Sequence, residues 1–142
     1  MPRKTEKGWR CLDHIADIRM EASGSNLTEL FLHAAQGLTE LLSPGEHVPA
    51  EREVELALEA GSAEELLVDW LREIHFANTT RGLVLVKTHI TEITDTSLKA
   101  LLSFAVRPPE KAPDIDIKGV TYHGLAIEKT DRKYLARVIF DI

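Results

Sequence analysis

The sequence predicts an α+β fold: a single domain in which a largely antiparallel sheet packs against two main helices. Two segments place apolar residues at the 3.6-residue period of an amphipathic helix, and six segments alternate apolar and polar residues as strands do. The predicted order is β-α-β-α-β-β-β-β, and its closing run of strands favours antiparallel pairing. With 142 residues, 44% of them hydrophobic, the chain can bury a core without disulfides.

The first half of the chain predicts a strand, a helix and a second strand. The alternation over Trp9–Ala22 is unbroken, so we expect one continuous strand there. Asn26, with Glu29 three residues later, makes a capping box for a helix that ends near Leu42. Arg52–Ala60 alternates again with glutamates on one side, which predicts a strand with one solvent-exposed face.

The second half predicts a helix and four strands. Ser62 and Glu65 form a second capping box, and apolar residues at helical spacing, including a core Trp70, continue to about Asn78. The predicted strands are Leu83–Thr94, Ser97–Arg107, Gly119–Glu128 and the segment from Lys133 to the end of the sequence. Residues 1–8 have no apolar period and predict a flexible N-terminal arm ahead of one domain at 9–142.

The composition disfavours nucleic-acid and membrane partners and indicates a cellular compartment. Seventeen Lys and Arg against 23 Asp and Glu give a formal charge of −6, which disfavours tight direct binding to the phosphate backbone of nucleic acids. The apolar runs are far shorter than the ~20 residues of a membrane span, and no secretory signal is readable at the start. The single cysteine suits a reducing compartment. We therefore expect a cytoplasmic protein with no membrane partner.

Several familiar catalytic motifs are missing from the sequence. It contains no glycine-rich phosphate loop, no G-x-S-x-G elbow, no H-E-x-x-H helix and no Cys-x-x-Cys pair. The six histidines are scattered without the spacing that brings two of them to one metal ion. These absences disfavour a self-contained nucleotide hydrolase and a zinc protease.

Carboxylates near the two ends of the sequence are the first candidates for chemistry. Asp13 and Asp17 are four residues apart on the predicted first strand, while Asp141 is followed by Ile142 and its α-carboxylate. If the first and last strands are neighbours in the sheet, Asp17 joins the two terminal groups. Clustered carboxylates repel one another unless a hard divalent cation binds between them. The alternative is that these acids are solvated at strand ends.

Three further residues are weaker or partner-dependent candidates. His14 shares its side of the predicted strand with apolar residues, so it is either a ligand or a hydrogen-bonded core imidazole. His123 follows a tyrosine in a strand and is either a contact residue or an exposed polar tip. Lys118 precedes Gly119 and either contacts a phosphate or partner carboxylate or is an ordinary exposed lysine.

The sequence resembles the archease family over residues 9–142. The resemblance rests on motifs in the family's order: Asp13-His14-Ile15-Ala16-Asp17, then Leu66-Leu67-Val68-Asp69-Trp70-Leu71-Arg72-Glu73, then Lys118-Gly119-Val120-Thr121-Tyr122-His123, and finally Phe140-Asp141-Ile142. One departure is Ile15, which stands where the family usually has threonine and removes a hydroxyl beside the acidic residues.

The resemblance implies a function that residue spacing does not. Archeases are protein cofactors, not enzymes, that help an RtcB-type RNA ligase in tRNA splicing and RNA repair become guanylylated and turn over repeatedly with GTP and manganese. It also implies a divalent metal site made by Asp17, Asp141 and the Ile142 carboxylate, with Lys118 needed for activation. Calcium is the ion expected in a crystal, and manganese or magnesium are alternatives.

Two other classes of function stay open from the sequence. A chaperone-like modulator of RNA-modifying enzymes should expose a sizeable apolar patch. An autonomous metal-dependent phosphohydrolase should have a pocket with a general base, which no motif supplies.

Overall fold

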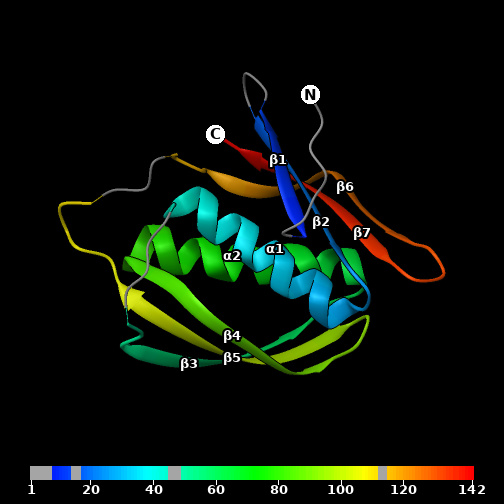
Figure 1. Cartoon of the computed structure of the whole chain (residues 1–142), viewed down its shortest axis with the longest axis horizontal. Helices are drawn as coiled ribbons and strands as arrows, with labels where there is room; N and C mark the ends of the chain where they lie inside the picture. Colours follow the sequence, from blue (N-terminus) through cyan, green and yellow to red (C-terminus); the bar gives the residue numbers. More distant parts are fainter. Residues whose placement is uncertain (1–7, 14–16, 45–48, 112–114) are drawn as a thin grey trace.

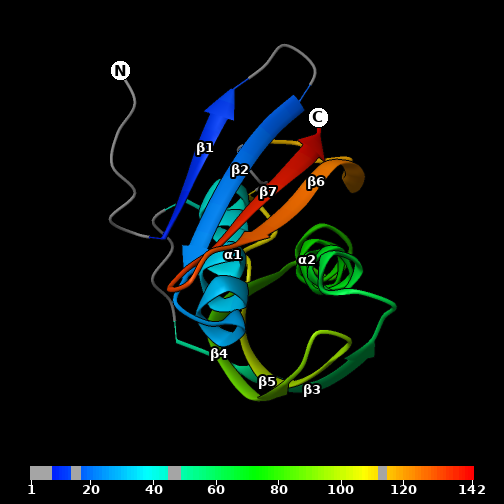
Figure 2. The same cartoon turned by 90° about the vertical axis from the view of Figure 1, so that its right-hand side faces the viewer.

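Two antiparallel sheets enclose a layer of two helices, giving three layers (Figure 2). The computed structural model describes residues 8–13, 17–44, 49–111 and 115–142. The predicted arm therefore lies outside the described residues except for Gly8, and so does His14. The predicted α+β class, a single domain with antiparallel strands packed on two main helices, is confirmed, but the strands form two sheets and not the one sheet that the sequence predicts. Neither helix in the described part of the chain is long and apolar enough to cross a membrane.

The first sheet has four strands in the order β1-β2-β7-β6. Its strands are β1 (Trp9–Asp13), β2 (Asp17–Gly24), β6 (Gly119–Lys129) and β7 (Tyr134–Asp141). The prediction of a single strand over Trp9–Ala22 is wrong, because β1 and β2 are separate and pair antiparallel, with Trp9 opposite Ala22. Alternation continued through the sequence between them, so the period alone did not mark the boundary.

The two helices begin at the predicted caps. In α1 (Leu27–Leu42), the Glu29 N–H donates to Asn26 Oδ1 over 2.8 Å, and in α2 (Ala63–Arg81) the Glu65 N–H donates to Ser62 Oγ over 3.2 Å. Each glutamate in turn accepts from the backbone N–H one residue before the cap, a small departure from the standard box. The second helix ends at Arg81, three residues beyond Asn78, because the C-cap residue Gly82 adopts a left-handed conformation.

The second sheet has the order β3-β5-β4 and confirms three predicted strands. They are β3 (Arg52–Glu59), β4 (Leu83–Ile93) and β5 (Ser97–Val106), and Thr94 organises the turn between the last two by accepting the N–H of Ser97 on its hydroxyl over 3.0 Å. Figure 1 shows this sheet below the helices, on the side opposite to β2 and β7.

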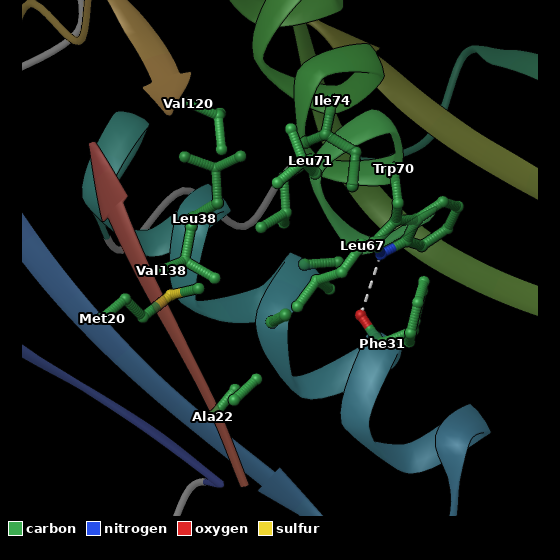
Figure 3. Close-up of a cluster of buried hydrophobic side chains, with 14 of the residues drawn as sticks. Met20, Ala22, Phe31, Leu38, Leu67, Trp70, Leu71, Ile74, Val120 and Val138 are labelled. Atoms are coloured by element: carbon green, nitrogen blue, oxygen red, sulfur yellow. Dashed lines mark hydrogen bonds between the residues drawn. The ribbon is translucent and has the colours of Figure 1, made fainter. Parts of the chain in front are cut away.

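The core lies between the helices and both sheets. Figure 3 shows side chains of α1 and α2 packed against those of β2, β6 and β7. Trp70 is fully buried, as predicted, and its indole N–H donates to the Phe31 carbonyl of the neighbouring helix over 2.9 Å. A buried indole needs such a partner, so this bond joins α2 to α1 within the core.

Candidate functional site

The start of β2 and the end of β7, the two central strands, meet at one end of the first sheet. Antiparallel register pairs Asp17 with Asp141 and, one residue further in, Ile18 with Phe140. Ile18 and Phe140 are buried in the core. A one-residue slip would turn their apolar side chains to the solvent face, so the core fixes the register that brings the two aspartates together. The two views of the chain agree, since the C-terminal mark lies beside the start of β2 in both (Figures 1 and 2).

The Asp17 carboxylate has an oxygen without a hydrogen-bond donor. Its side chain is 27% exposed, but Oδ1 is buried and accepts no hydrogen bond. The Arg19 guanidinium Nε is 3.9 Å away, within range of a weak ion pair but beyond hydrogen-bond distance. A buried acceptor that lacks a donor is unfavourable by roughly 1–3 kcal/mol. A cation at this oxygen would relieve that penalty.

The start of β6 lies at the same end of the sheet. Gly119 is also paired with Asp141, and the Lys118 N–H donates to the Asp141 carbonyl over 2.7 Å. The Lys118 side chain is exposed to solvent. The structure therefore brings Asp17, Asp141 and the Lys118 backbone to one place, while Ile142 follows Asp141 and is also exposed.

Helix α2 contributes two residues that the sequence did not single out for the site. His75 Nε2 lies 2.6 Å from the Ile117 carbonyl oxygen, and the Arg72 guanidinium donates to the Val120 carbonyl from Nη2 at 3.0 Å and from Nε at 3.2 Å. Arg72 also lies over the ring of Tyr122, 4.7 Å from its centroid. The sequence signal that could have found them was their i, i+3 spacing, which places both on one face of the helix.

The structure also places two of the weaker candidates. The sequence predicts Asp13 on the same strand as Asp17, but Asp13 lies on the neighbouring strand β1, where its backbone pairs with Ile18, the residue next to Asp17. His123 is exposed in the irregular part of β6, where its N–H donates to Thr121 Oγ1 over 3.1 Å.

The side chains that could bind a metal ion at this end of the sheet are carboxylates, which offer oxygen atoms and negative charge. Within the described ranges, no three His, Cys, Asp or Glu side chains are grouped as a metal cluster. The side chains of Asp17 and Asp141 offer carboxylate oxygens, the ligand type that favours a hard ion such as calcium, magnesium or manganese. The buried Asp17 oxygen without a donor fits such an ion.

Comparison with known proteins identifies the family. A family model described as the archease protein family matches residues 9–142. The chain belongs to the archease family. An archease of Methanosarcina mazei is 36% identical to it over the full length of both chains. An archease of Thermococcus kodakarensis is 32% identical, covering 94% of this chain and 98% of that one.

Solved structures of archease-family proteins have the same fold. The solution structure of a Methanobacterium thermoautotrophicum protein has a TM-score of 0.78 and 28% identity, covering 96% of this chain and 99% of that chain. A crystal structure of a Thermotoga maritima archease, described as a possible chaperone, has a TM-score of 0.66 and 25% identity, covering 92% of this chain and 94% of that chain.

Proposed function

We propose that this archease activates an RtcB-type RNA ligase in the cytoplasm and is not itself an enzyme. In this proposal it promotes GTP-dependent guanylylation of the ligase during tRNA splicing and RNA repair, so that the ligase turns over repeatedly. The observation that carries the proposal is the pairing of Asp17 with Asp141 beside Lys118, in a chain whose family is established.

The proposal includes a divalent metal site where the start of β2 meets the end of β7. Asp17, Asp141 and the α-carboxylate of Ile142 would hold the ion, with the buried Asp17 oxygen as one ligand. When bound, the ion supplies positive charge that offsets carboxylate repulsion and attracts phosphate oxygens. The register of β2 and β7 fixes the two aspartates at the same end of the sheet.

Lys118 supplies a positive charge next to the Asp17–Asp141 pair. Its backbone is bonded to Asp141, while its side chain extends into solvent, where a partner can reach it. A lysine ammonium is a compact charge suited to a phosphate oxygen or a partner carboxylate. We therefore assign Lys118 a contact role in ligase activation.

The overall charge favours a protein partner with a basic surface. A formal charge of −6 gives electrostatic attraction to an enzyme that binds RNA through Lys and Arg, which raises the rate of association. In this proposal the archease binds the ligase, and RNA is held by the ligase.

Ligase guanylylation at limiting manganese tests the proposal directly. The archease should raise the rate of covalent GMP incorporation from GTP, whereas Lys118→Ala and Asp141→Asn should lose most of that stimulation. Lys133→Ala and Asp131→Asn are matched controls, because both residues are exposed near the β6–β7 turn, at the far end of the sheet. No stimulation by the unmodified chain would overturn the proposal.

The same experiment distinguishes the two alternatives. The description of the Thermotoga maritima archease as a possible chaperone supports a chaperone-like role. Among the described residues, the large exposed apolar side chains are Val54, Phe76, Val86, Val106, Tyr122 and Ile142. A chaperone would protect the ligase from inactivation without changing its guanylylation rate. A phosphohydrolase would consume GTP in the absence of ligase.

A further inference from the structure

We infer that Arg72 and His75 position Lys118 for its role in ligase activation, an inference that rests on the proposed function. The two residues are three apart on α2 and project from the same face of the helix. His75 Nε2 lies 2.6 Å from the Ile117 carbonyl oxygen, and Arg72 donates to the Val120 carbonyl at 3.0 and 3.2 Å. One helix therefore holds the backbone carbonyls on both sides of Lys118.

The segment around Lys118 needs this support because regular strand pairing begins only after it. The first paired residue of β6 is Gly119, so Lys118 and Ile117 lie outside the strand. Ile117 is buried, as is Val120 on the other side. With the Lys118 N–H bonded to Asp141, the backbone is fixed to β7 on one side and to α2 on the other.

The contacts of Arg72 indicate a structural use of its charge. Its guanidinium donates twice to one carbonyl and also lies over the Tyr122 ring, 4.7 Å from the centroid. A planar guanidinium with both kinds of contact is held in one orientation better than a lysine would be. Arg72 therefore joins α2 to β6 at two points, on the C-terminal side of Lys118.

Positioning matters for Lys118 because its side chain is long and has many rotamers. Two fixed carbonyls restrict where its ammonium can reach relative to Asp141, and a displacement of about 1 Å at a contact group can reduce a rate by about 100-fold. Removing either support should thus weaken activation without removing the ammonium itself. Neither residue needs to touch the ligase for this effect.

The test uses variants that remove or keep the hydrogen-bond donor. His75→Leu removes the donor, His75→Gln keeps an N–H, and Arg72→Met removes the guanidinium but keeps an apolar stem. We expect the donor-free variants to lower the maximal rate of ligase guanylylation about tenfold, with little change in the archease concentration that gives half-maximal stimulation. His75→Gln should recover most of the rate. Glu73→Ala, at an exposed site on the same helix, should leave it unchanged.

Combination with Lys118→Ala separates positioning from general destabilisation. If Arg72 and His75 act through Lys118, adding either donor-free change to Lys118→Ala should cause no further loss. Circular dichroism checks that each variant is folded. If His75→Leu fails to fold, Arg72→Met, alone and combined with Lys118→Ala, still tests the inference.

The failures of the two proposals are distinguishable. If Lys118→Ala abolishes the stimulation but the folded donor-free variants keep it, the positioning role alone is overturned. An additive further loss in the double variants would also overturn it. If the unmodified chain does not stimulate the ligase, the proposed function is overturned and this inference with it.

Discussion

Asp17 lies directly opposite Asp141 in the antiparallel pairing of β2 with β7. Two acidic side chains in a directly paired position are unfavourable in a sheet, since like charges there repel. One carboxylate oxygen of Asp17 is buried and has no hydrogen-bond donor. Direct pairing of the two aspartates is therefore unfavourable in the absence of a cation, and the proposed metal ion would offset it.

Metal ions should stabilise the unmodified chain more than variants of this pair. At a free manganese or calcium concentration of about 100 times Kd, the free energy of unfolding should rise by about 2.7 kcal/mol. Asp17→Asn and Asp141→Asn should reduce that gain, and in chelator they should be at least as stable as the unmodified chain because the repulsion is removed. Thermal unfolding in chelator and in metal measures both effects.

Two controls sharpen the metal experiment. Asp131→Asn changes an exposed acid near the β6–β7 turn and should keep the full gain. A peptide fused after Ile142 converts its α-carboxylate to an amide and should reduce the gain. Equal metal-induced stabilisation of every form would contradict the assignment of these ligands.

Most of the element order was predictable from local periodicity, but the first hairpin was not. The three residues between β1 and β2, His14-Ile15-Ala16, include no glycine or proline, the residues that usually mark a turn. Strand pairing depends on contacts between residues far apart in the chain, so the order β1-β2-β7-β6 was also beyond a one-dimensional pattern. The sequence alone therefore predicts that Asp17 lies near Asp141 only if the first and last strands are neighbours in the sheet.

The supporting residues of the site were harder to predict than the acids. The carboxylates stood out because acidic residues sit near both ends of the sequence. Arg72 and His75 instead bond to backbone carbonyls 48 and 42 residues away. Every residue has a backbone carbonyl, so the amino-acid sequence does not indicate which one is the partner. Their contacts depend on the packing of α2 against β6, which is known only from the structure.

Replacing Trp70 with phenylalanine should destabilise the core at the junction of the two helices. The change removes the indole N–H, leaves the Phe31 carbonyl without this donor and opens a small cavity in a fully buried position. We expect a loss of about 2–3 kcal/mol in the free energy of unfolding, measured by urea denaturation. Tyr122→Phe, at an exposed ring, should change it by less than about 0.5 kcal/mol.

The α1 cap should make stability depend on pH through Glu29. Its carboxylate accepts hydrogen bonds from the Ser25 N–H and hydroxyl, and the backbone bond is the main reason that the pKa of Glu29 is lowered from its ordinary value of 4.5. A carboxyl whose pKa falls on folding stabilises the native state above its unfolded pKa and loses that effect as pH falls through the folded pKa. Glu29→Gln should therefore be less stable than the unmodified chain at pH 7, with the difference shrinking below about pH 4.5.

Glu40→Gln is the matched control for the cap. Glu40 is an exposed glutamate on the same helix, away from its first turn. Its replacement should give a much smaller difference in melting temperature across the same pH range. A Glu29→Gln difference that stays constant from pH 7 to pH 3 would contradict the assignment of the pH effect to this carboxylate.

Two glycines of β6 should respond oppositely to alanine. Gly124 has φ of +71°, and an added Cβ would lie 2.6 Å from Ile139 Cδ1, a buried side chain of β7. Gly124→Ala should therefore cost about 1–3 kcal/mol from backbone strain and crowding. Gly119 has no atom within 4 Å of such a Cβ and no positive φ, so Gly119→Ala should be neutral or stabilising by up to about 1 kcal/mol. Urea denaturation of both variants in chelator compares them without any metal contribution. Similar losses for the two would show that the irregular part of β6 does not require the left-handed conformation at Gly124.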